Sequence, residues 1–173
     1  MKYAREFILP IAGLAPGKTN FTFNLGRPFF ALVDDDEVIN GKVNVELQLD
    51  KRENMIELHF TINGWLEVPC DRCADEFHQP IEGNQILILK YGERYEEETD
   101  EIIIIPADHH EFDISKLLYE YIILLLPIRK VHPDDNNGNT LCNKEVLSKL
   151  EQLRIETESD PRWEALKKIN FQS

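Results

Sequence analysis

Strict alternation of apolar and polar residues is the clearest pattern of the chain, and it occupies two runs between Gly41 and Val68. The apolar positions are Val43, Val45, Leu47 and Leu49 in the first run, and Ile56, Leu58, Phe60 and Ile62 in the second. A period of two predicts strands with one buried face. The polar residues 50–54 between the runs predict a turn.

The Asn63–Gly64 pair is typical of a two-residue hairpin turn. A turn at this place would set Phe60 opposite Glu67 and mix the polar and apolar faces. A strand that continues through the pair keeps the alternation. We therefore expect one long strand over about 55–68, with a bend or bulge at Gly64.

The remaining patterns predict further strands and then helices. The sequence "CDRC" predicts the tip of a hairpin, whose returning strand over 77–91 is interrupted by Pro80 and Gly83. Shorter strands are expected at 2–10, 19–25 and 101–106. Helices are expected at 113–127, 142–154 and 160–169, the first with Asp113 as N-cap and Pro127 as its stop.

Strands followed by helices predict an α+β fold with a mostly antiparallel sheet, which could be barrel-like, and C-terminal helices packed on it. A length of 173 residues suits a single domain, 1–173, with 1–112 mainly β and 113–173 mainly helical. The longest apolar runs are too short to span a membrane, which needs about 18 residues.

The charge of the chain is strongly negative and unevenly distributed. The formal net charge is −13, of which residues 1–112 carry −12 and residues 113–173 carry −1. This charge argues against simple wrapping of nucleic acid, which relies on Lys and Arg. The acidic runs Asp34–Glu37 and Glu96–Glu101 predict solvated loops, or else an acidic face for a basic partner such as a ribosomal protein.

Two of the three cysteines lie in "VPCDRCADEF", as Cys70 and Cys73. A pair at this spacing can bind a metal, form a redox disulfide, or do neither. A thioredoxin-like pair needs a helix that starts at the first cysteine. The residues after Cys73 resemble a strand instead, so redox chemistry is disfavoured.

A closed tetrahedral zinc site needs two further ligands. His132 and Cys142 flank a polar loop that follows the first expected helix. With Cys70 and Cys73 they would form a Cys₃His set for a structural zinc ion. The alternatives are a thiol redox protein that uses the CxxC pair, and an acidic interaction domain for a basic protein in which the cysteines are incidental.

No motif of the sequence requires an enzyme. It contains no phosphate-binding glycine loop and no nucleophile elbow. His109 and His110 beside Asp108 could imitate an acid–base cluster, but their place before a helix predicts a surface loop. A reducing cytoplasm is the expected compartment, because three cysteines do not form a disulfide framework.

The segments "VPCDRCADEF", "LLLPIRKVHPDDNNGNTLC" and "DPRWEALKKI" together resemble the YceD-like family, the large ribosomal RNA subunit accumulation proteins. The resemblance covers the chain from about Gly41 to its end. Many family members carry a second CxxC-like cluster after the "LP" motif. This chain has only Cys142 there, which makes His132 the expected fourth ligand.

The resemblance implies a non-catalytic role in accumulation of large-subunit ribosomal RNA, and hence in ribosome biogenesis. The expected partner is a basic ribosomal protein or a pre-ribosomal particle, bound through the acidic first part of the chain. Direct RNA contact through the nearly neutral second part is less favoured, because the net field of the chain repels RNA at long range.

Overall fold

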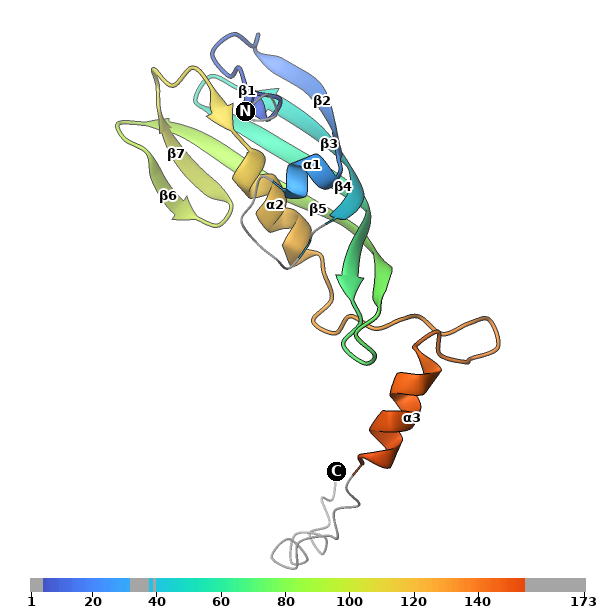
Figure 1. Ribbon diagram of the computed structural model, residues 1–173. Coiled ribbons are helices and arrows are strands. Elements are labelled where there is room, and N and C mark those ends of the chain that lie inside the picture. Colours follow the sequence, from blue (N-terminus) through green and yellow to red (C-terminus); the bar gives the residue numbers. More distant parts are fainter. Residues whose placement is uncertain (1–4, 32–37, 39, 155–173) are drawn as a thin grey trace, which may run out of the picture.

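Most of the regular structure in the computed structural model is strand, and the structure describes residues 5–31, 38 and 40–154 (Figure 1). The strands are β1 (Ile8–Leu9), β2 (Gly17–Leu25), β3 (Asn40–Lys51), β4 (Met55–Pro69), β5 (Glu76–Gly92), β6 (Glu96–Thr99), β7 (Ile102–Pro106) and β8 (Phe112–Asp113). The helices are α1 (Arg27–Phe30), α2 (Ser115–Leu124) and α3 (Lys144–Gln152). None of the helices in these described ranges has the length and hydropathy to cross a membrane.

Six strands form one mixed sheet in the order β2-β3-β4-β5-β7-β6. Neighbouring strands are antiparallel except β5 and β7, which are parallel because the chain forms β6 on the far side of β7 before returning. β2 and β6 are the edges and do not pair with each other, so the sheet is open. β1 and β8 form a separate two-stranded ribbon.

The predicted alternation sets the register of the long strands. Leu47 lies opposite Phe60 and Leu49 opposite Leu58, and all four side chains are buried. β4 continues through Gly64, which lies opposite Val43 with φ +154°. The prediction of one continuous strand rather than a turn at this place is confirmed.

One face of the sheet carries the hydrophobic core and the other is solvated. The β1–β8 ribbon, α1 and α2 contribute buried side chains to the core. Tyr121 of α2 packs edge-on against Phe60, with ring centroids 5.4 Å apart, and Phe7 packs in the same way against Phe29 at 5.1 Å. Polar residues such as Glu46 alternate with the core positions and are exposed.

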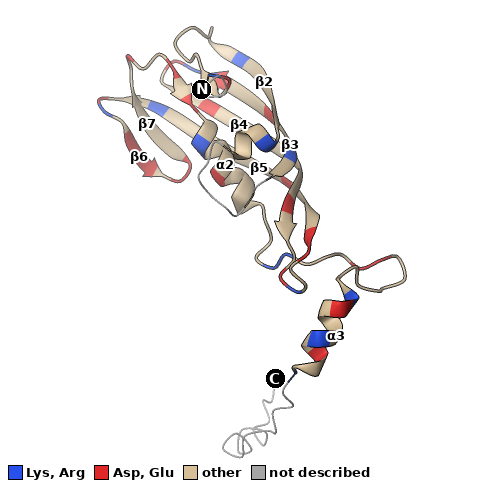
Figure 2. Cartoon of the chain, in the orientation of Figure 1, with Lys and Arg blue, Asp and Glu red and all other residues tan. Residues whose placement is uncertain are grey.

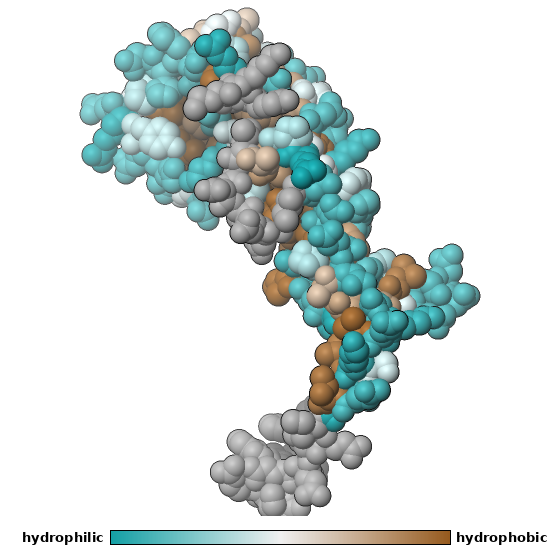
Figure 3. Space-filling view, viewed as in Figure 1, coloured by the Kyte–Doolittle hydropathy of each residue, from teal (hydrophilic) through white to brown (hydrophobic). Residues whose placement is uncertain are grey.

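The predicted fold class is wrong. The molecule is mainly a sheet, the sheet is neither closed nor wholly antiparallel, and its helices are short. α3 buries none of its residues and leaves a hydrophobic stripe open, with Leu150 48% and Leu153 76% exposed (Figure 3). Helical periodicity predicts an apolar stripe but does not say that the sheet covers it. The helix predicted at 160–169 lies outside the described residues.

Several boundaries also differ from the prediction. Pro80 and Gly83 do not interrupt β5, which pairs with β4 without a break. The N-cap of α2 is Ile114, because Asp113 remains paired with Ile8 in the ribbon. The Asp113 carboxylate still accepts a hydrogen bond from the backbone N–H of Ser115 at 2.8 Å.

The β4–β5 hairpin extends beyond the rest of the sheet as an arm. β3 pairs with β4 only as far as Glu67, whereas β4 and β5 pair up to Pro69 and Glu76. Figure 1 shows the segment after α2 crossing the tip of this arm, with α3 beyond it. The arm therefore brings the CxxC pair to the segment that contains His132 and Cys142.

Candidate metal centre

The CxxC pair lies in a tight turn at the tip of the arm. The backbone N–H of Cys70 donates to Asp75 O at 2.9 Å, and that of Ala74 donates to Cys70 O at 2.8 Å. Ala74 is the one non-glycine residue with positive φ (62°) among the residues that the structure describes. The strained backbone conformation of Ala74 is thus part of a tight turn that places both cysteine side chains on one side.

The segment after α2 is joined to this turn by hydrogen bonds. The backbone N–H of Asp71 donates to Lys130 O at 2.7 Å, and the N–H of Lys130 donates to the Asp71 carboxylate at 2.6 Å. The side-chain amide of Asn143 donates to Asp75 at 3.0 Å. These contacts fix the segment on both sides of His132 and Cys142.

The start of α3 follows directly after Cys142. Asn143 is the N-cap, and its side-chain oxygen accepts from the backbone N–H groups of Glu145 at 3.0 Å and Val146 at 3.4 Å. Capping of this kind fixes the direction in which the chain enters the helix. The orientation of Cys142 is therefore set by the helix that follows it.

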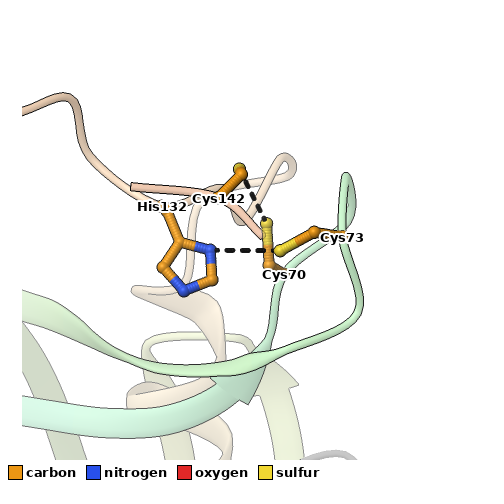
Figure 4. A group of neighbouring side chains, drawn as sticks. All are labelled: Cys70, Cys73, His132 and Cys142. Atoms are coloured by element: carbon orange, nitrogen blue, oxygen red, sulfur yellow. Dashed lines mark hydrogen bonds between the residues drawn. The ribbon is translucent and has the colours of Figure 1, made fainter. Parts of the chain in front are cut away.

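The structure brings together all four predicted ligands, whose donor atoms lie within 4.8 Å of one another (Figure 4). Cys70 Sγ lies 3.8 Å from Cys142 Sγ, and Cys73 Sγ lies 3.5 Å from His132 Nδ1. In a tetrahedral zinc site with ordinary bond lengths, two sulfurs are about 3.8 Å apart, and a sulfur and a nitrogen about 3.6 Å. The observed separations match those two edges of the tetrahedron.

The three cysteines are buried and unpaired by disulfides. Cys70, Cys73 and Cys142 are 2%, 4% and 3% exposed, and all three are free thiols. Four partly buried side chains pack around them, namely Phe77, Val131, Val146 and Leu147. The three cysteines thus form a small buried cluster of their own, and Phe77 packs against both this cluster and the core of the sheet.

Hydrogen bonds prepare one thiol for ionisation. Burial raises the pKa of Cys70, but backbone N–H donors outweigh it and lower that pKa to about 6. One of these donors is the N–H of Arg72, 3.4 Å from Cys70 Sγ. Burial raises the pKa of Cys73, and the neighbouring thiols of Cys70 and Cys142 raise it as well. Closely packed thiols of this kind need a cation to ionise together.

The donor set fits zinc. Thiolate and imidazole nitrogen are the ligands of structural zinc sites, and a Cys₃His set closes a tetrahedron without an open position. A donor set with three sulfurs also suits iron, although the histidine favours zinc. The residues present are therefore sufficient for a closed structural metal site.

The other chemically suggestive residues lie elsewhere. Asp108, His109 and His110 are exposed in the segment between β7 and β8. The acidic run Glu96–Glu101 includes the exposed edge strand β6 rather than a loop alone, and Asp34–Glu37 lies outside the described residues. Sequence reasoning missed Ala74, whose backbone conformation only the structure reveals.

An open mixed sheet with a Cys₃His cluster at the tip of its longest hairpin defines the architecture of the chain. Residues 58–170 match the family described as large ribosomal RNA subunit accumulation protein YceD, and the chain belongs to that family. The matched segment includes all four residues of the cluster. No curated protein and no solved structure matches the chain significantly.

Proposed function

We propose that the chain is a non-catalytic factor in accumulation of large-subunit ribosomal RNA, and that it contains a structural zinc site. The family match supports the first part of the proposal. The second part rests on the approach of the Cys70, Cys73, His132 and Cys142 donor atoms within 4.8 Å. When bound, zinc would supply a cross-link and no reactive position, because the four residues fill its coordination.

A structural role explains the burial of the cluster better than a redox role. Reactive thiols lie in partly exposed, electropositive surroundings where another thiol can reach them. Each of the three cysteines is at most 4% exposed. The burial therefore favours a metal ligand set over a thiol redox pair.

The partner that we propose is a basic ribosomal protein, free or in a pre-ribosomal particle. The net charge of −13 supports this choice, because it attracts basic proteins and repels RNA at long range. Free thiols suit the reducing cytoplasm, where ribosomes are assembled. The chain would act as one unit in which the zinc site holds α3 to the sheet.

The test is complementation of a host that has been depleted of its own family member. The parent chain should restore the ratio of large-subunit to small-subunit ribosomal RNA. The His132→Asn variant should restore it poorly, whereas the matched control His78→Asn should restore it fully. His78 suits the control because it lies on the arm, 59% exposed, and stacks on Trp65.

Protein amounts and zinc content must be measured alongside the RNA ratio. A parent chain that leaves the ratio low would contradict the role in ribosomal RNA accumulation. A zinc-free His132→Asn variant that restores the ratio fully would contradict the need for the metal and leave the role itself intact.

A further inference from the structure

A groove of about 970 Å³ separates the β6–β7 hairpin from α2 at the end of the sheet away from the metal centre. Its apolar lining comes from both sides and consists of Ile103, Phe112, Leu117, Tyr119, Tyr121, Ile123 and Leu124. A cavity of this size lies in the range of ligand sites, which bury apolar groups and orient them with a few polar ones.

The polar lining of the groove is strongly acidic. It contains five carboxylates against one lysine, and the carboxylates are Glu97, Glu98, Asp100, Asp113 and Glu120. Figure 2 shows the acidic residues along β6. Lys116 pairs with Glu120 at 3.3 Å and Lys90 with Glu98 at 2.9 Å. The remaining carboxylates keep the groove negative, so it attracts cations.

A buried hydroxyl belongs to one residue of the groove lining, Tyr121. Tyr121 is 7% exposed, and its hydroxyl has no hydrogen-bond partner in the part of the chain that the structure describes. Buried polar atoms are nearly always hydrogen-bonded, so this hydroxyl carries a desolvation cost. Its oxygen is closed to solvent, so the attraction for a ligand comes from the carboxylates and the apolar lining of the groove.

We propose that the groove binds a basic and partly apolar peptide segment of a protein partner. The carboxylates would pair with Lys or Arg, and the apolar lining would take the side chains between them. Tyr95, 51% exposed at the rim, adds an aromatic face for a cation. A phosphate backbone is disfavoured, because the same carboxylates repel it.

Only the identity of the partner, a basic ribosomal protein, rests on the proposed function. The charge and shape of the groove are independent of that role. They would favour a segment in which cationic and apolar residues alternate. A purely cationic segment would bind more weakly, because it leaves the apolar lining in contact with water.

The experiment measures binding of a short fluorescein-labelled peptide of alternating lysine and leucine to the full chain by fluorescence anisotropy. A peptide with serine in place of leucine should bind more weakly. The rim variant neutralises three carboxylates of the groove, as Glu97→Gln, Asp100→Asn and Glu120→Gln. The control variant makes the same charge change outside the groove, as Glu46→Gln, Glu53→Gln and Glu82→Gln.

The rim variant should weaken binding of the lysine–leucine peptide about tenfold or more, and the control variant less than about threefold. Equal weakening by both variants would overturn the inference, because it would mean attraction by the net charge alone. Absence of binding to the parent would overturn it as well. So would a single-stranded RNA that binds the parent and loses affinity in the rim variant.

The inference and the proposed function can fail separately. If the peptide does not bind while His132→Asn still lowers the ribosomal RNA ratio, only the groove inference fails. If the rim variant loses the peptide while the parent chain never restores the ratio, the groove stands and the proposed role fails.

Discussion

Cys70 Sγ lies 3.8 Å from Cys142 Sγ, although 72 residues separate the two cysteines in the sequence. The chain between them forms β5, β6, β7, β8 and α2, so the contact joins the arm of the sheet to the segment that leads into α3. Few other contacts hold α3, because none of its residues is buried. The cysteine cluster, against which Val146 and Leu147 pack, is therefore the main attachment of this helix among the described residues.

Removal of the metal should loosen the arm tip and α3 but leave the sheet folded. The sheet core and the cysteine cluster share no buried residue and are joined through the partly buried Phe77, so loss of the cluster should disturb the sheet core only next to Phe77. Zinc binds finger peptides with roughly 10–16 kcal/mol at neutral pH, so it stabilises its surroundings strongly. Amide hydrogen exchange should rise in 70–75 and 130–152 after chelation and stay constant in β3 and β4.

The Cys142→Ser variant should show the same local exchange pattern without chelator. Mass spectrometry of the parent chain, purified under reducing conditions, should find about one zinc per chain, and far less in the variant. A metal-free parent whose exchange is unaffected by chelator would contradict the proposed site.

Replacement of Ala74 by glycine should stabilise the hairpin tip. Ala74 has φ 62°, a conformation that costs an L-residue roughly 1–2 kcal/mol. Glycine avoids this cost but loses about 0.5–1 kcal/mol through its freer unfolded chain. The Ala74→Gly variant should thus gain about 0.5–1 kcal/mol, visible as a melting temperature about 2 °C higher. An Ala74→Val variant should melt lower, and the reverse order would contradict the account.

Replacement of Gly64 by alanine should strongly destabilise the sheet. A Cβ at Gly64 would meet the carbonyl oxygen of Lys42 and lie 2.7 Å from Val43 Cα, and both are backbone atoms of β3 that cannot turn aside. We expect a loss of about 2–4 kcal/mol, from overpacking and from the strained φ. Urea unfolding measures it.

Gly13 is the matched control for this substitution. A Cβ there would only make an ordinary contact with Pro10 O at 3.7 Å. The Gly13→Ala change should stay within about 0.5 kcal/mol of the parent. A similar loss from both variants would show that close approach of β3 and β4 is not the cause.

The sequence predicts the long strands well because both of them bury one face. Phe60 and Leu47 occupy positions whose alternation leaves one consistent register, and that phase also excludes the turn at Gly64. The four predicted ligands also lie together, since a hairpin tip and a polar loop flanked by His132 and Cys142 can meet without disturbing either core.

The fold class could not be predicted in the same way. The spacing of Leu150 and Leu153 predicts a helix, but only the tertiary structure reveals that neither packs on the sheet. The parallel pairing of Leu89 with Ile103 depends on β6 forming outside β7, a choice without a local sequence signal. The groove depends on that same choice, and no local sequence signal predicts it.

Replacement of Tyr121 by phenylalanine should leave the free protein equally or more stable. The lost hydroxyl is buried without a hydrogen-bond partner among the described residues, so its removal relieves a desolvation cost. We expect a change between zero and a gain of about 1 kcal/mol in urea unfolding. The aromatic contact with Phe60 is retained by the substitution.

The same substitution should change the response to alkaline pH. Burial, with the charges of Glu120 and Glu101, raises the pKa of Tyr121 above its ordinary value of about 10. The folded state therefore holds the phenolic proton more tightly than the unfolded state. The stability of the folded state is therefore unaffected by this group below pH about 10. It falls as the pH rises further, because the unfolded state releases the phenolic proton first.

Urea midpoints at neutral pH and at pH about 11 should therefore differ more in the parent than in Tyr121→Phe. An identical alkaline loss in both proteins would assign it to other groups, such as Tyr95, whose pKa is also raised by burial and by Glu97.

β5 connects the two ends of the molecule as one uninterrupted strand from Glu76 to Gly92. Phe77 packs against His132 at one end, and Leu89 pairs with Ile103 of the groove lining at the other. At about 3.3 Å per residue, these points are at most about 40 Å apart. The strand thus acts as a spacer of set length, so a partner bound in the groove reaches the cysteine cluster only if it extends over about that distance.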